Sequence, residues 1–143
     1  MPPRFAGEPR RVSAMTVLTA ASWKGLRAAA GGEGAALLVV SLCAAWCDTC
    51  NEFRLAFERI AGARPHMRFL WLDIEDDAEI CGEVDVENFP TLAVWRGGTL
   101  LFYGVSLPQE GGVARLVDAL ATQGPAASDA PGAVHQLGRT LSR

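Results

Sequence analysis

The sequence has no surplus of positive charge, because 13 Lys and Arg residues stand against 16 Asp and Glu residues, for a net charge of −3. A nucleic-acid-binding domain needs a basic surface that neutralises phosphates, so this class of protein is excluded. No apolar run is long enough to span a membrane either. The longest candidate, residues 35–45, is short, lies deep in the chain and is typical of a buried strand. We expect neither a nucleic-acid partner nor a membrane.

Cysteine and histidine are both scarce. Four cysteines in 143 residues are too few for the disulfide framework of a small secreted protein. The first 14 residues are rich in Pro and Arg and lack the apolar core of a secretory signal, so we expect a reducing, cytoplasmic location. A zinc site is not expected, because the cysteines and histidines outside the Cys47/Cys50 pair have irregular spacings: Cys43, His66, Cys81 and His135.

The hydrophobic pattern predicts an α/β protein in which strands and helices alternate. The expected strands are residues 16–18, 36–43, 68–73, 92–95 and 99–103. The expected helices are residues 22–30 with Ser22 as N-cap, 47–64, 77–83 and an amphipathic helix through 113–120. Gly97-Gly98 predicts a hairpin between the last two strands. This order indicates a central mixed sheet, parallel first and then antiparallel, with helices on both faces.

The length predicts one domain with a substantial core. We place this domain at residues 15–122 and expect it to be monomeric. Residues 1–14 are interpreted as a flexible N-terminal arm. From Gly124 onward the composition turns to Gly, Pro, Ala and Ser, which predicts a flexible C-terminal tail over residues 123–143.

The segment Trp46-Cys47-Asp48-Thr49-Cys50 carries the clearest chemical signal. It follows an apolar strand pattern and opens a helix pattern, so Cys47 falls at a helix N-terminus, where unpaired N–H groups and partial positive charge favour a thiolate. The three-residue spacing puts Cys50 about one turn further along the same side of the helix. One sulfur can then attack while the other waits to resolve the product.

Together with four other features, this segment makes the chain resemble thioredoxin over residues 15–122. The features are Ala45 before Trp46-Cys47, the run Asn88-Phe89-Pro90-Thr91-Leu92, the glycine pair Gly97-Gly98, and Gly104. The resemblance implies the thioredoxin fold, in which a mixed sheet is flanked by helices on both faces.

The resemblance also implies a mechanism. Cys47 matches the nucleophile that forms a mixed disulfide with the substrate, and Cys50 matches the resolving thiol. A redox-active Cys47–Cys50 disulfide would form with no bound cofactor. Trp46, Phe89, Thr91 and a cis Pro90 would line the substrate site.

The function implied is reduction of protein disulfides, which contributes to cell redox homeostasis and electron transport. A reductase or another dithiol donor would recycle the protein. The alternative is a thioredoxin-like binding module, an assembly factor or chaperone partner that uses the groove around Trp46 and Phe89-Pro90 with little redox turnover.

Two of the chain's departures from the family concern the residues around the cysteines. Asp48-Thr49 stands where thioredoxins usually have Gly-Pro. Thr49 loses the backbone restriction of proline, and Asp48 either places a negative charge near the thiolate or acts as helix N-cap. Ser41 replaces the buried aspartate of the family, and Trp71 replaces its lysine partner. We therefore expect weaker activation of Cys50, with Ser41 and a water as a hypothetical substitute.

Two accessory thiols and an acidic segment complete the candidates. Cys43 is interpreted as a buried inert thiol, or alternatively as a third redox partner close to Cys47. Cys81 is either a structural apolar residue or a surface thiol open to oxidation. Eight of the 16 acids lie between Asp73 and Glu87. They form either a solvated helix with its loops or an acidic rim that favours basic partners.

Overall fold

The computed structural model describes residues 17–23, 37–86, 88–96, 99–105, 109–122 and 130–142. Within these ranges, one sheet has the spatial order β1-β3-β2-β4-β5. Its strands are β1 (Val17–Leu18), β2 (Leu37–Cys43), β3 (Arg68–Asp73), β4 (Thr91–Arg96) and β5 (Thr99–Val105). β3 pairs in parallel with β1 and β2, whereas β4 is antiparallel to both β2 and β5. The predicted mixed sheet is confirmed.

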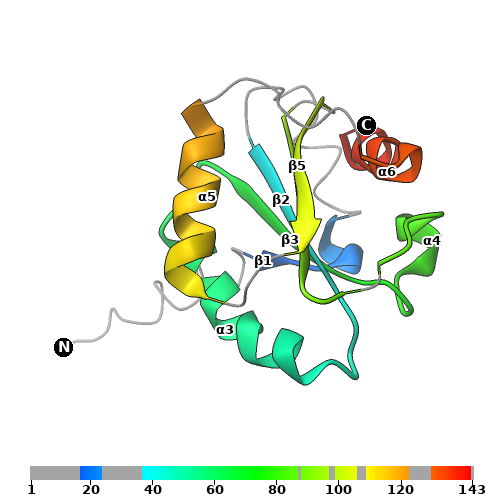
Figure 1. Cartoon of the computed structure of the whole chain (residues 1–143), viewed down its shortest axis with the longest axis horizontal. Coiled ribbons are helices and arrows are strands. Elements are labelled where there is room, and N and C mark those ends of the chain that lie inside the picture. Colours follow the sequence, from blue (N-terminus) through cyan, green and yellow to red (C-terminus); the bar gives the residue numbers. More distant parts are fainter. Residues whose placement is uncertain are drawn as a thin grey trace.

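Helices cover both faces of this sheet (Figure 1). α3 (Asp48–Gly62) and α5 (Glu110–Thr122) share one hydrophobic cluster with one face. The other face packs against α4 (Ala78–Cys81), α6 (Gly132–Ser142) and the helical residues 20–23. None of the helices in these described ranges is long and apolar enough to cross a membrane.

The central strand β2 is buried along its whole length. Alternate side chains of a strand point to opposite faces. Leu37 and Val39 therefore pack on the α3 side, while Leu38 and Val40 pack on the α6 side. The same alternation carries Ser41 and Cys43 to the α3 side, beneath the first turn of that helix. This alternation of side chains places Ser41 and Cys43 at the active site.

The prediction of a flexible tail over residues 123–143 is wrong for its second half. Residues 132–142 form α6, and Val134, Leu137 and Leu141 are buried against the sheet. The small residues that suggested a tail instead allow a close approach. A Cβ at Gly138 would collide with the indole of Trp95. Residues 123–129 lie outside the described ranges, as do the predicted arm at 1–14 and the Gly97-Gly98 turn.

The first helix begins earlier than the sequence pattern suggested. Ser22 was expected to cap it, but the structure has helix from Ala20, and Ser22 Oγ accepts the backbone N–H of Thr19 at 2.8 Å. Ser22 thus lies in the first turn, and Thr19 precedes the helix. Trp23 is buried in the core on the α6 side. The predicted continuation through residues 24–30 falls outside the described residues.

Candidate active site

Cys47 is the N-cap of α3. Its backbone is extended, with φ −88° and ψ 111°, and its Sγ accepts the backbone N–H of Cys50 at 3.3 Å. The side chain is partly exposed. The alternative in which Asp48 caps the helix is therefore wrong. Asp48 is the first helical residue, and it and Thr49 are both exposed to solvent. The Cys47 sulfur thus lies among the N–H groups that the first turn of a helix leaves without an intrahelical partner.

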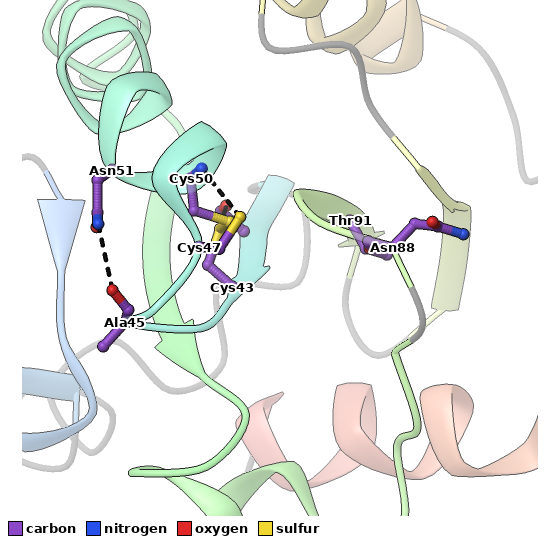
Figure 2. The surroundings of a disulfide bond; sticks show 8 residues. Cys43, Ala45, Cys47, Cys50, Asn51, Asn88 and Thr91 are labelled. Atoms are coloured by element: carbon purple, nitrogen blue, oxygen red, sulfur yellow. Dashed lines mark hydrogen bonds between the residues drawn. A yellow bond between two sulfur atoms is a disulfide. The ribbon is translucent and has the colours of Figure 1, made fainter.

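Cys50 is bonded to Cys43 in this structure, and Cys47 is a free thiol (Figure 2). The Cα atoms of Cys43 and Cys50 are 6.0 Å apart. Cys43 is thus not the inert thiol expected, and its partner is Cys50 rather than Cys47. The physical reason is the alternation of side chains along β2, which directs the Cys43 side chain towards the buried side of α3. The expected Cys47–Cys50 disulfide stays a prediction for a state in which Cys43 is reduced.

Ser41 is fully buried, and its Oγ lies 3.4 Å from Cys43 Sγ. Because a disulfide sulfur carries no hydrogen, the hydroxyl is the donor. Ser41 thus contacts Cys43 in this structure, whereas the proposed role of Ser41 and a water at Cys50 stays a prediction. Its neighbour across the sheet is Trp71, whose ring lies beside Phe53 and beneath the Arg54 guanidinium, 4.7 Å from the centroid. A hydroxyl and an aromatic ring therefore lie side by side on β2 and β3 behind the cysteines.

An aromatic surface borders the cysteines. Trp46 is 63% exposed and packs edge-on against Phe89, with ring centroids 5.3 Å apart and an interplanar angle of 87°. The indole N–H of Trp46 donates to Glu75 Oε2 at 3.2 Å. The Phe89–Pro90 peptide bond is cis. These contacts join the segment after β2 to the segment after β3 and to the segment before β4 at one edge of the site.

Thr91 stabilises the turn that carries Phe89. Its side chain is buried, and Oγ1 donates to the backbone carbonyl of Asn88 at 2.6 Å. Its backbone pairs with Leu42, the residue before Cys43, so the turn from Asn88 to Thr91 ends beside the disulfide. Figure 2 shows Asn88 and Thr91 of this turn to one side of the three cysteines, with the Asn88 side chain directed away from them. Thr91 holds the shape of the turn rather than presenting its side chain to a substrate.

Two further residues of the site were not identified from the sequence. The Asn51 side-chain amide donates to the Ala45 carbonyl at 3.2 Å and fastens the loop before α3. Glu75 holds the indole of Trp46, and its long sequence separation from Trp46 concealed the contact. For Cys43 the signal was available, because every second residue of the strand 37–43 faces the same helix.

The acidic segment is mostly engaged in local turns. Asp73 Oδ1 accepts the backbone N–H groups of Glu75 and Asp76, both at 2.8 Å, and Asp77 Oδ2 accepts that of Asp73. Glu79, Glu83 and Asp85 are exposed to solvent. The solvated-helix interpretation therefore accounts for most of these acids. Among the acids of this segment that the structure describes, Glu75 contacts the site, and Glu87 lies outside the described residues.

Cys81 lies on the other face of the sheet and is 3% exposed. Burial, followed by the charges of Asp77 and Asp73, raises the pKa of Cys81 to about 12. The alternative of a reactive surface thiol is contradicted, because the side chain is both covered and protonated at neutral pH. Cys81 is a structural residue.

Several known proteins are similar to this chain. The family model Thioredoxin matches residues 17–113. Thioredoxin H2-1 of Oryza sativa subsp. japonica is 34% identical over 62 residues, which are 43% of this chain and 45% of that protein. The matched part thus spans less than half of that relative.

Two solved structures share the fold. A poplar thioredoxin h, PtTrxh4, is 15% identical with a TM-score of 0.63 over 76% of this chain and 98% of that chain. A chain from the complex of ferredoxin:thioredoxin reductase with thioredoxin f2 is 17% identical with a TM-score of 0.58, over 72% of this chain and 93% of that chain. At these identities the two structures support the fold alone.

Proposed function

The chain belongs to the thioredoxin family, because the family model covers residues 17–113, and on that premise we propose that it is a thiol-disulfide oxidoreductase that reduces disulfides in other proteins. One observation carries the proposal. Cys47 is a partly exposed thiol at the N-terminus of α3, and the sulfur of the next cysteine, Cys50, lies buried one turn behind it.

The reaction proceeds by two thiol–disulfide exchanges. The Cys47 thiolate attacks one sulfur of the substrate disulfide, and the other substrate sulfur leaves as a thiolate that takes up a proton. Cys50 then attacks Cys47 Sγ and releases the second substrate sulfur. The substrate gains two electrons and two protons, and the protein is left oxidised as a Cys47–Cys50 disulfide.

The surface of Trp46 and Phe89 is the proposed substrate site. Trp46 is exposed beside Cys47, and Phe89 precedes the buried Pro90. An extended substrate segment can pair with the backbone at Phe89 in the manner of an added strand. Loss of the Trp46 side chain is expected to weaken reduction of protein disulfides more than reduction of a small aromatic disulfide.

Recycling requires an external source of two electrons, for which we propose a reductase or a small dithiol. Membership of the thioredoxin family supports a protein donor of this class. We further propose a cytoplasmic monomer that contributes to redox homeostasis and electron transport without a bound cofactor.

The test is reduction of insulin with dithiothreitol as electron donor. Cys47→Ser is expected to abolish the rate above background, because no other cysteine in the described ranges is both exposed and free. Cys50→Ser is expected to accumulate mixed disulfides with insulin, since the resolving sulfur is absent. Equal signals from wild type and both variants would contradict the proposal and favour the binding module.

A further inference from the structure

Cys50 has two sulfur neighbours. Its own backbone N–H donates to Cys47 Sγ at 3.3 Å, and its sulfur is bonded to Cys43, whose Cα is 6.0 Å away. A Cα separation of this size lies within the range of protein disulfides. The reaction proposed above needs Cys50 to bond with Cys47 at the end of each cycle. The structure shows that Cys50 also bonds with a cysteine for which that reaction has no use.

We propose that Cys43 is a third catalytic thiol, which takes Cys50 from Cys47 and leaves the nucleophile free while the protein is oxidised. This inference rests on the proposed function, because it begins from the disulfide that substrate reduction leaves behind. It concerns a residue on β2 that faces α3, outside the Cys-x-x-Cys segment.

The exchange balances within the protein. The Cys43 sulfur attacks Cys50 Sγ, the Cys47–Cys50 bond breaks, and a Cys43–Cys50 bond forms. The Cys47 sulfur leaves as a thiolate. Cys43 loses one proton and Cys47 takes up one proton, so the number of protons on the protein does not change. One disulfide replaces another, so no oxidant or reductant is consumed.

Ser41 is placed to assist this step. Its hydroxyl is fully buried on the same face of β2 as Cys43 and lies 3.4 Å from the Cys43 sulfur. A hydroxyl donor beside a buried sulfur favours the negative charge that the sulfur must carry as it attacks. Ser41 is thus a positioning residue for Cys43.

Burial determines which sulfurs of the oxidised protein an external molecule can reach. Cys43 is 1% exposed and Cys50 is fully buried, whereas Cys47 is partly exposed. An external dithiol therefore cannot reach the Cys43–Cys50 bond in the folded protein. Reduction must pass through Cys47, which attacks Cys50 and returns the disulfide to the accessible pair. The oxidised state is thus held as a buried Cys43–Cys50 disulfide, and its reduction requires Cys47.

The pairing is tested by finding the free thiol of the oxidised protein. Cys81→Ala is oxidised, quenched with acid, unfolded and labelled with N-ethylmaleimide, and the labelled residue is identified by mass spectrometry after digestion. The expected label is on Cys47. A label mainly on Cys43 would mean a Cys47–Cys50 pair and would overturn the inference, while leaving the proposed function intact.

The route of reduction is tested with Cys47→Ser. Oxidised Cys47→Ser is expected to be reduced by dithiothreitol at least about tenfold more slowly than the oxidised wild type, because its disulfide is buried and opens only by local unfolding. Guanidinium should remove the difference. Equal rates in the folded proteins would contradict the proposed route.

Iodoacetamide separates this inference from the proposed function. In the oxidised wild type, Cys47 is expected to be alkylated. In oxidised Cys43→Ser and Cys43→Ala, Cys47 is tied to Cys50 and should be protected, with Cys81→Ala as the matched control that behaves like wild type. Equal alkylation in all four proteins would overturn the role of Cys43. Failure of wild type to reduce insulin would instead overturn the proposed function.

Discussion

At the scale of single residues, the direction in which each side chain points decides which thiols are reactive. Cys43 and Cys50 are both buried. They meet because Cys43 lies on the face of β2 that α3 covers, and Cys50 lies on the side of α3 that faces the sheet. Cys81 is equally buried but lies on the opposite face of the sheet, among apolar side chains. Similar burial thus gives a redox partner in one place and an inert thiol in the other.

The inert character of Cys81 predicts a pH dependence. Its folded pKa is about 12, above the value of about 8.5 expected in an unfolded chain. The unfolded chain releases this proton more readily, so the stabilisation is fully present below about pH 8.5 and is lost as the pH rises towards 12. Denaturant unfolding at pH 7 and pH 10 should show a larger loss of stability for wild type than for Cys81→Ala. Identical losses would contradict the assigned pKa.

At the scale of elements, ion pairs join α5 to α3 and to Arg64, which follows the end of α3. Arg64 donates two hydrogen bonds of 2.8 Å to the carboxylate of Asp118, and Arg59 pairs with Glu110 at 2.8 Å. Arg64 is largely buried, but Asp118 is exposed. The pairs therefore fix how the helices lie against each other more than they stabilise the fold.

Asp118→Asn is expected to lower the free energy of unfolding at pH 7 by less than about 1 kcal/mol, the usual range for an exposed pair. The hydrogen bond from Arg64 lowers the pKa of Asp118, so its contribution is present above about pH 4 and is lost at more acidic pH. Urea unfolding at pH 7 and pH 3 measures both values. Glu58→Gln, which loses the Arg54 pair at 3.4 Å within α3, is the control for removing a carboxylate.

The contact between α6 and β4 predicts a larger effect. Gly138→Ala places a methyl group against the indole of Trp95, which is fully buried, so the helix must shift. Overpacking of this kind costs about 1–3 kcal/mol. Gly112→Ala in α5 is the matched control, because its Cβ would meet nothing within 4 Å. It should be neutral or stabilising through helix propensity. Thermal unfolding of the two variants checks the contrast.

At the scale of the whole molecule, α6 completes the cover of one sheet face. α4 is only four residues long, so it leaves much of this face to α6. Val134, Leu137 and Leu141 supply that cover beside Trp95. The active site lies against the opposite face, at the end of β2. One face thus carries Cys43 and Cys50, and the other, which includes the structural residue Cys81, is closed by the C-terminal helix.

Removal of residues 132–143 is expected to cost most of the stability of the domain. Burial of three large apolar side chains contributes about 5 kcal/mol or more, which is comparable with the whole stability of a small domain. The truncated protein should lose cooperative thermal unfolding and bind a hydrophobic dye. A truncated protein with an unchanged melting temperature would show that α6 is dispensable.

The sequence alone determined the strand and helix order and the candidate pair Cys47 and Cys50, because these depend on local periodicity and spacing. It predicted β3 at residues 68–73 with the bounds the structure has. Only the tertiary structure decided that Cys43 is the partner of Cys50 and that the small-residue C-terminal segment closes the core. Both results depend on which face of β2 or β4 meets a helix from elsewhere in the chain, and that meeting follows from the packing of the whole domain rather than from any local stretch of residues.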